Sequence, residues 1–160
     1  DLADFLPYLV LVGGWVPYWL AHSTLDGKLF GKAPGFLITD RVGWILLVIG
    51  ASIYLWCAYD FTFIGRGTPA IYDPPKRLVI QGLYNYVRNP MYVGIITVVI
   101  GQMFIYGSPA VLFYSLMLGI LFTSFVIVYE EPHLRKKFGE DYDRYTQRVN
   151  RWLPKLLCCA

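Results

Sequence analysis

Three long stretches of the 160-residue chain lack charged side chains, and this absence restricts the fold more than any other feature. Residues 5–25, 42–59 and 89–129 contain no Asp, Glu, Lys or Arg over 21, 18 and 41 positions. A helix needs about 20 mainly apolar residues to cross the hydrocarbon core of a bilayer. The first two stretches are each long enough for one such helix and the third for two. The sequence therefore predicts a membrane protein.

The turn residues at 106–109 (Tyr-Gly-Ser-Pro) divide the longest stretch into a helical hairpin. Because a backbone in hydrocarbon must satisfy its own hydrogen bonds, we expect an all-α, polytopic membrane protein with about four transmembrane helices. Residues 1–160 are expected to form a single membrane domain, in which residues 130–160 are an amphipathic interfacial or cytoplasmic tail. The predicted helices lie near residues 5–21, 42–64, 90–106 and 109–129.

The composition excludes several other classes of protein. Hydrophobic residues make up 56% of the chain and charged residues 16%, against about 25% charge in ordinary soluble domains. The net charge of +3 is too small and too scattered to indicate a nucleic-acid binder. Cys57, Cys158 and Cys159 form neither a disulfide framework nor a zinc-binding spacing, so we expect no metal site. We interpret Cys57 as a packing residue and the terminal pair as free thiols, with acylation as the alternative for the pair.

Positive charge is unevenly distributed between the predicted connections, and this sets the orientation. Residues 65–88 hold four Lys and Arg and the tail after Tyr129 holds seven, against three in residues 22–41. Four helices put the first two segments on the same side, which the positive-inside rule makes cytoplasmic together with both termini. The acidic flank formed by Asp1 and Asp4 favours a membrane helix over a signal peptide at the first stretch.

Apolar residues recur in the C-terminal tail with the period of a helix. Spacings of four, three, four and three residues predict one apolar face. We expect this helix to lie in the membrane interface and also to close a pocket. Gly139 is predicted to end a shorter helix before it, and Asp141 is predicted to cap it. The residues of the apolar face are Phe138, Tyr142, Tyr145, Val149 and Trp152.

Two polar clusters flank the predicted hairpin on its cytoplasmic side. One spans Tyr84–Gly94 before the third helix, and the other spans Glu130–His133 after the fourth. Because an antiparallel hairpin returns its open ends to one side, we expect the clusters to be neighbours. Glu130 and Glu131 are expected at a helix C-terminus, where negative charge is unfavourable, so Arg88 or a bound cation should compensate them.

Ordinary structural roles are open for some of the same residues. Glu131 can start a further helix, with Pro132 in its first turn. Pro90 can start the third helix, and Gly94 can permit close packing of two membrane helices. The sequence alone leaves these alternatives open.

The residues of both clusters resemble the signature of one family. The run 88–94 (Arg-Asn-Pro-Met-Tyr-Val-Gly), an apolar hairpin and then Glu130-Glu131-Pro132 are similar to the tripartite pattern of isoprenylcysteine carboxyl methyltransferases. That pattern reads Arg-His-Pro-x-Tyr-x-Gly, a hydrophobic stretch and Glu-Glu. Segments 67–69 and 73–77 resemble the bacterial branch of the family, and segment 138–154 resembles its C-terminal pattern. Several motifs in the same order make the resemblance specific.

The resemblance implies an integral-membrane methyltransferase that uses S-adenosylmethionine, in what would be a bacterial cytoplasmic membrane. The cofactor would bind on the cytosolic side, between the hairpin and the C-terminal segment. The sequence departs from the pattern at Asn89, where the best-known members of the family have His; Asn can form hydrogen bonds but cannot titrate near neutrality. Carried over by position, the cofactor-binding residues are Tyr84, Asn89, Tyr92, Gly94, Glu130 and Tyr145, and the candidate catalytic residues are Arg88, Glu131 and Arg151.

The implied cofactor suits these residue types. S-adenosylmethionine carries a sulfonium, an ammonium and a carboxylate, so its pocket needs acid, base and ring faces together. Methyl transfer requires alignment and exclusion of water rather than a protein nucleophile. We expect the acceptor to be small or lipid-like, with a reacting carboxylate, thiol or amine, and to be reached from the membrane lipid.

Two other functions are alternatives at this point. One is a non-catalytic membrane subunit that keeps the helices of the family but packs against protein partners. The other is a membrane reductase of the related sterol type, which uses a nicotinamide dinucleotide. The sequence has no Gly-x-Gly-x-x-Gly, although membrane reductases do not require one.

Overall fold

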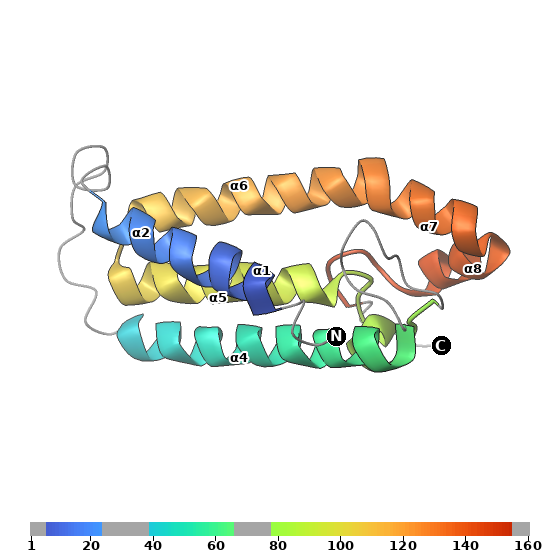
Figure 1. The fold of residues 1–160 in the computed structure, drawn as a ribbon, viewed down its shortest axis with the longest axis horizontal. Helices are drawn as coiled ribbons and strands as arrows, with labels where there is room; N and C mark the ends of the chain where they lie inside the picture. The colour runs from blue at the N-terminus through green and yellow to red at the C-terminus, as the bar shows by residue number, and fades with distance from the viewer. Residues whose placement is uncertain (1–5, 24–38, 66–77, 155–160) are drawn as a thin grey trace.

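The computed structural model describes residues 6–23, 39–65 and 78–154, in which helices run along the long axis of an elongated bundle (Figure 1). The predicted all-α, polytopic fold is confirmed, since the described residues hold no strand beyond one isolated bridge between Val87 and Asn150. The predicted motifs at 67–69 and 73–77 and the thiols of Cys158 and Cys159 lie outside the described residues. The elements are α1 (Leu6–Val10), η2 (Leu11–Trp15), α2 (Val16–His22), α4 (Thr39–Asp60), η3 (Phe61–Gly65), η4 (Gly82–Asn85), α5 (Pro90–Tyr106), α6 (Pro109–Phe125), η5 (Val126–Glu130), α7 (Glu131–Phe138) and α8 (Glu140–Arg148).

The hairpin of α5 and α6 begins and turns where the sequence predicts. Both helices start at a proline, whose missing N–H is not needed in a first turn. Gly107 ends α5 with φ +59°, a left-handed conformation that glycine adopts without strain. The Ser108 hydroxyl then accepts a hydrogen bond from the Val111 amide and caps α6.

Helices α4 and α5 meet with their backbones in contact. Gly43 of α4 faces Gly101 of α5, and Gly50 faces Gly94, so each helix supplies a glycine every seven residues. A Cβ on Gly101 would lie 2.7 Å from the Gly43 carbonyl oxygen, and one on Gly94 would lie 2.9 Å from the Gly50 oxygen. Small residues permit this close approach between membrane helices, where packing rather than the hydrophobic effect drives association.

The rod α1–η2–α2 lies across α5 and α6 and is held by polar contacts at its π-helical turn η2 (Figure 1). The Tyr114 hydroxyl of α6 donates to the Val12 carbonyl at 3.1 Å, and the Gln102 amide of α5 donates to the Gly13 carbonyl. In hydrocarbon an unpaired carbonyl is costly, so these bonds fix where the N-terminal rod can sit.

Two described helices are long and apolar enough to cross a membrane, and they remain largely exposed in the bundle. They are residues 40–63 and 109–138, and only 28% and 22% of their most apolar windows are buried. The second runs for 30 residues, about 45 Å at 1.5 Å per residue, against a hydrocarbon core of about 30 Å. Its charged last third, from Glu130 to Phe138, therefore projects beyond the hydrocarbon.

The tail folds back on the protein, which differs in part from the sequence prediction. Gly139, with φ +54°, separates α7 from α8 as predicted, but it also occupies the N-cap position assigned to Asp141, and that assignment is wrong. The positive φ that turns the chain suits glycine, so the cap lies two residues earlier than predicted. The apolar face predicted for the tail packs inside the protein as a buried cluster: Tyr142, Tyr145 and Val149 against Leu78, Leu134 and Phe138.

Candidate active site

The two polar clusters meet at the open end of the α5–α6 hairpin. The Tyr92 hydroxyl on α5 donates a hydrogen bond to Glu130 Oε2 at 3.1 Å, although the residues are 38 positions apart. Arg88 Nη1 lies 3.1 Å from Glu131 Oε1 across 43 positions. These contacts confirm the prediction, made from topology alone, that the clusters are neighbours.

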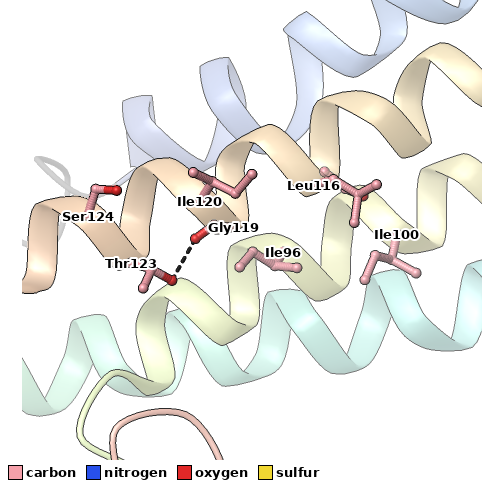
Figure 2. Close-up of a pocket in the computed structure, with 8 residues that line it drawn as sticks. Ile96, Ile100, Leu116, Gly119, Ile120, Thr123 and Ser124 are labelled. Atoms are coloured by element: carbon pink, nitrogen blue, oxygen red, sulfur yellow. Dashed lines mark hydrogen bonds between the residues drawn. The ribbon is translucent and has the colours of Figure 1, made fainter.

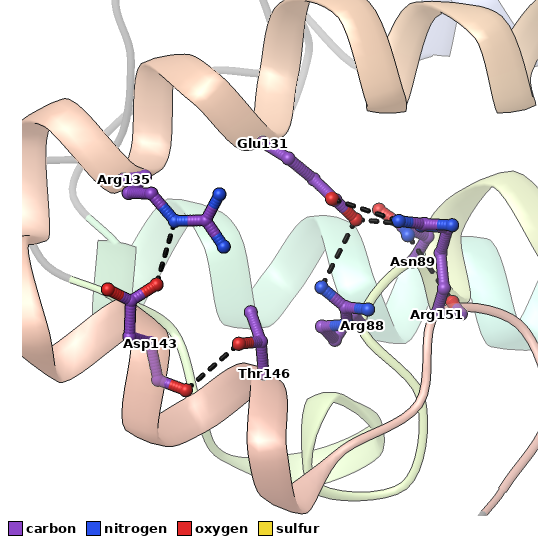
Figure 3. Close-up of polar contacts among 7 residues, drawn as sticks. All are labelled: Arg88, Asn89, Glu131, Arg135, Asp143, Thr146 and Arg151. Atoms are coloured by element: carbon purple, nitrogen blue, oxygen red, sulfur yellow. Dashed lines mark hydrogen bonds and ion pairs between the residues drawn. The ribbon is translucent and has the colours of Figure 1, made fainter.

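Glu131 lies between two arginines (Figure 3). Arg151 approaches its carboxylate with Nε at 2.7 Å and Nη2 at 3.0 Å, the two-pronged geometry that guanidinium groups favour. Arg88 contacts the same carboxylate at Oε1, the oxygen that Arg151 Nε also contacts, and the Arg88 and Glu131 side chains are each only 14% exposed. Partial burial acts to raise the pKa of Glu131, but the hydrogen bond from Arg151 and the charges of both arginines outweigh it and leave the pKa below its usual value.

The acid pair does not end a helix, and that expectation is wrong. The π-helical turn η5 carries the helix through Glu130 into α7, with Glu131 as its first residue. Pro132 follows in the first turn of α7, where a proline needs no hydrogen-bond donor. Arg88 is therefore not compensating a helix terminus; it forms an ion pair with Glu131 in its own right.

Glu130 has a different environment from its neighbour. Its carboxylate accepts a hydrogen bond from the Tyr92 hydroxyl, and among the described residues no arginine pairs with it. Burial raises the pKa of Glu130, and the adjacent charge of Glu131 adds to the effect, although the bond from Tyr92 opposes it. The Tyr92 ring in turn lies 4.7 Å from Phe122 and 6.5 Å from Trp152, measured between ring centroids. Glu130 is thus bonded to the hydroxyl of a tyrosine whose ring belongs to an aromatic group, and acids and ring faces both attract cations.

Asn89 fastens the C-terminal segment to the start of α5. Its buried side-chain amide donates to the Arg151 carbonyl at 3.3 Å (Figure 3). The Arg88 amide donates to the Asn150 carbonyl at 2.9 Å beside the Val87–Asn150 bridge. We call residues 149–152 the strap. An amide side chain suffices for its contact, which needs one donor and no titration.

The other predicted residues lie behind or away from this group. The Tyr145 hydroxyl donates to the Tyr84 carbonyl at 2.7 Å, and the buried Tyr84 side chain packs with Cys57 and Val79. Tyr84 and Tyr145 therefore brace η4 against α8. Gly94 lies in the contact between α4 and α5, the packing role that the sequence left open. The residues brought together are Arg88, Asn89, Tyr92, Glu130, Glu131 and Arg151.

Sequence reasoning missed two residues near this end of the bundle. Phe122 stands beside the Tyr92 ring, but in sequence it is one apolar residue among many. Asp60 is buried at the end of α4, and a Cβ on Gly82 would collide with its Oδ2 atom. That oxygen has no hydrogen-bond partner among the residues that the structure describes. The sequence did offer one indication of Asp60, because this acid directly follows the uncharged stretch 42–59.

Comparisons with known proteins match most of the chain to one family. Residues 38–141 match the phospholipid methyltransferase (PEMT) family. The matched segment contains Arg88, Tyr92 and both acids, and it ends before Arg151.

Individual relatives carry two kinds of methyltransferase name. A probable protein-S-isoprenylcysteine O-methyltransferase of Oryza sativa is 29% identical over 140 residues, covering 84% of this chain and 71% of the relative. The protein-S-isoprenylcysteine O-methyltransferase of Schizosaccharomyces pombe is 35% identical over 161 residues, covering 86% and 66%. A phosphatidylethanolamine N-methyltransferase of Schizosaccharomyces japonicus is 26% identical over 159 residues, covering 96% of this chain but 16% of that protein.

The predicted family is thus confirmed by the relatives and by the family match. The isoprenylcysteine relatives carry the name that the Arg88 and Glu130 motifs suggested, and the family match covers most of the bundle. With its apolar helices and its polar group at one end, the chain belongs to the phospholipid methyltransferase family and is a membrane-associated methyltransferase.

Proposed function

We propose that this chain transfers a methyl group from S-adenosylmethionine to a lipid-borne acceptor at the cytoplasmic face of its membrane. The observation that carries the proposal is the convergence of Tyr92–Glu130 and Arg88–Glu131–Arg151 at one end of the α5–α6 hairpin. The distribution of Lys and Arg in the sequence supports the cytoplasmic placement of that end and of both termini.

The residues present fit the charges of the methyl donor. Arg88 Nε is buried and has no hydrogen-bond partner among the described residues, so this guanidinium has a donor left for a carboxylate. Arg151 lies next to it through their shared contact with Glu131. The acids match the ammonium or the ribose hydroxyls of the donor, and Tyr92, Phe122 and Trp152 offer ring faces to its cationic side. When bound, S-adenosylmethionine supplies a methyl group activated by positively charged sulfur.

The protein contributes alignment and exclusion of water. Asn89 and the Arg88 amide hold the strap beside the start of α5, and the strap brings Trp152 near the Tyr92 ring. Holding donor and acceptor in line, and keeping water out, lowers the activation barrier for a methyl displacement. Glu130, whose pKa burial raises, is placed to take a proton at its carboxylate from an amine or thiol acceptor.

The names of the relatives support a lipid-borne acceptor. Two kinds of acceptor follow from them, the carboxylate of an isoprenylated cysteine and the amine of a phospholipid. Both acceptors are anchored in the bilayer by hydrocarbon chains. The exposed apolar surface of this chain lies in the same hydrocarbon, so protein and acceptor can meet there.

Calorimetric titration of the purified protein with S-adenosylmethionine tests the proposal. Saturable heat is expected for the wild type, and Glu130→Ala should remove it while leaving the helical content unchanged. Arg135→Ala is the matched control, because Arg135 lies one turn further along α7 and forms an exposed pair with Asp143 (Figure 3). A wild type that takes up no cofactor at millimolar concentration would contradict the proposal and favour a non-catalytic subunit.

A further inference from the structure

Three stacked rings run along the long helix where it leaves the hydrocarbon. The ring centroids of Phe125 and Tyr129 lie 5.3 Å apart, and those of Tyr129 and His133 lie 6.1 Å apart at an interplanar angle of 7°. The π-helical turn η5 carries the middle ring, and its i→i+5 bonds place side chains four residues apart more nearly above one another than an α-helix does. We call Phe125, Tyr129 and His133 the ring ladder.

The outer end of the ring ladder is positively charged. On its inner face α7 packs against α8, and Glu131 and Arg135 are held there by partners in the candidate site and on α8 (Figure 3). His133 is two positions from each of them, so at about 100° per residue it points to the opposite side of the helix. The residues three and four positions after His133 share its side. They are Lys136 and Lys137, and all three side chains are exposed.

The position of the ring ladder along the helix places it at the membrane surface. Tyr129 comes 20 residues after Pro109, about 30 Å at 1.5 Å per residue, and the hydrocarbon core is about 30 Å thick. Tyrosine is typical of this boundary. His133 lies about 6 Å further along the helix and Lys137 about 12 Å, and the headgroup layer on each side is about 5–8 Å thick. Because lysine side chains extend back toward the surface, the charged ends of Lys136 and Lys137 reach the depth of the lipid phosphates.

The chemistry of this surface favours an anionic lipid. A phosphate diester accepts a hydrogen bond from an imidazole N–H and pairs with ammonium charges, the groups that His133, Lys136 and Lys137 present. A zwitterionic headgroup would bring its own ammonium close to the two lysines, whereas an anionic headgroup brings no second cation. Below the phosphate, the ring faces of Tyr129 and Phe125 are apolar walls for the first part of an acyl chain.

The groove between α5 and α6 is a lipid-facing surface without this charge (Figure 2). Its volume is about 460 Å³, and its lining combines isoleucine, leucine and glycine residues with the hydroxyl-bearing Ser115, Thr123 and Ser124. None of these described lining residues is charged. An acyl chain in the groove therefore meets no group that distinguishes one headgroup charge from another.

We propose that the ring ladder and the outer face of α7 form a seat for an anionic phospholipid. Its phosphate lies at His133, Lys136 and Lys137, and the start of one acyl chain lies along Tyr129 and Phe125. This lipid is not the acceptor of the methyl group, because the helix itself separates it from the inner face that carries Glu131. It holds α7 at the membrane surface and thereby steadies the acid pair.

Photolabelling in nanodiscs tests which lipid binds and where. The full chain is placed in phosphatidylcholine nanodiscs with a minor fraction of a probe, either phosphatidylglycerol or phosphatidylcholine with a diazirine in the upper half of one acyl chain. Irradiation, digestion and mass spectrometry then locate the labels. We expect labels on Phe125 and Tyr129 to be about fivefold or more higher with the phosphatidylglycerol probe. Labels on Thr123 and Ser124, at nearly the same depth in the groove, should be equal for the two probes.

A pair of double variants separates this seat from a general attraction of the charged end. Lys136→Gln with Lys137→Gln should lower the labelling ratio at the ring ladder to about one. Arg144→Gln with Arg148→Gln removes the same charge from exposed positions on α8 and should leave the ratio unchanged. A ratio near one in the wild type, or an equal loss in both double variants, would overturn the assignment.

Hydrogen exchange gives a second readout that needs no label. Unlabelled phosphatidylglycerol in the nanodisc should slow exchange of the α7 amides about threefold or more, since a bound ligand opposes local opening. Tyr129→Leu keeps every charge but removes the middle ring, so most of this protection should be lost. Tyr59→Leu is the matched control, because it removes another exposed tyrosine ring, stacked on Phe63 of η3. Full protection in Tyr129→Leu, or none in the wild type, would each overturn the seat.

The seat and the proposed methyl transfer can fail separately. Phosphatidylglycerol has no amine, thiol or carboxylate to methylate, so its labelling does not depend on turnover. A wild type that prefers this lipid at the ring ladder but takes up no S-adenosylmethionine keeps the seat and loses the methyl transfer. A wild type that binds the cofactor without the lipid preference loses the seat alone.

Discussion

Helix α5 meets its two neighbours in opposite ways. Toward α4 it presents Gly94 and Gly101, and the backbones touch with no room for a methyl group. Toward α6 it presents Tyr92, Ile96 and Ile100 across a seam that holds a groove of about 460 Å³ and ends in hydrogen bonds and ion pairs. Helix α5 is therefore packed tightly against α4 on one side and borders the groove and the candidate site on the other. Substitutions on these two sides should have different consequences.

The largest effect is expected at the closed side. In Gly101→Leu the new Cβ would lie 2.7 Å from the Gly43 carbonyl oxygen and 2.9 Å from the Leu47 amide nitrogen. Because backbone atoms cannot rotate away, the helices must separate, at a cost of about 3 kcal/mol or more. Thermal unfolding in detergent should show a large loss of stability. Gly119→Leu on the open side has space and should change stability by about 0.5 kcal/mol or less; equal losses in both variants would contradict the contrast.

The next effect is expected in the strap. Glu131→Gln removes the charge shared by Arg88 and Arg151 and leaves two positive groups facing each other. Hydrogen exchange of the Arg88 amide, which donates to the Asn150 carbonyl, should accelerate about tenfold or more, as loss of a charged hydrogen bond predicts. Amides of α4 and α5 should keep their protection. Asp143→Asn in the exposed pair with Arg135 is the control and should have little effect.

A smaller effect is expected from one hydroxyl group. Tyr92→Phe keeps the ring beside Phe122 but removes the donor to Glu130, so the Kd for S-adenosylmethionine should rise about five- to tenfold. Tyr114→Phe removes a comparable bond, to the Val12 carbonyl, within the bundle and should leave that Kd unchanged. Calorimetry measures both, and identical Kd values for wild type and Tyr92→Phe would remove Tyr92 from the binding site.

The smallest effect is expected from pH. The folded pKa of Glu131 lies below its unfolded value, so the stabilisation it provides is fully present above the unfolded pKa, about 4.3, and is lost as pH falls through the folded pKa. Exchange at the strap should therefore be flat between pH 7 and 5, after correction for intrinsic rates, and rise only in stronger acid. The rise should be absent in Glu131→Gln; a transition near neutrality in the wild type would show that another group controls the strap.

Much of the fold could be predicted because its signals are local. Pro90, Gly107 and Pro109 mark helix ends by backbone chemistry alone, and the hairpin they define places Arg88 beside Glu131 without further knowledge. The continuation of α6 through the acid pair could not be predicted, because a π-helical turn such as η5 changes the register by one residue and leaves no compositional mark.

The remaining differences are three-dimensional in origin. Gly94 looked equally suited to a ligand and to a helix contact until its partner, Gly50, was known. Phe122 belongs to the site only because α6 is placed against Tyr92 by the N-terminal rod and the seam. The roles of Gly94 and Phe122 both depend on how pairs of helices are placed, and the pattern of a single sequence does not contain that information.

The unbroken passage of α6 into α7 has a mechanical consequence. Residues 109–138 form one continuous helix that extends out of the hydrocarbon. A change in its tilt within the lipid would therefore move Glu130 and Glu131. Tyr92 and Arg88 belong to the other arm of the hairpin and would not move with it. We therefore expect the distance between the acid pair on this helix and Tyr92 and Arg88 on the other arm to depend on the thickness of the surrounding bilayer.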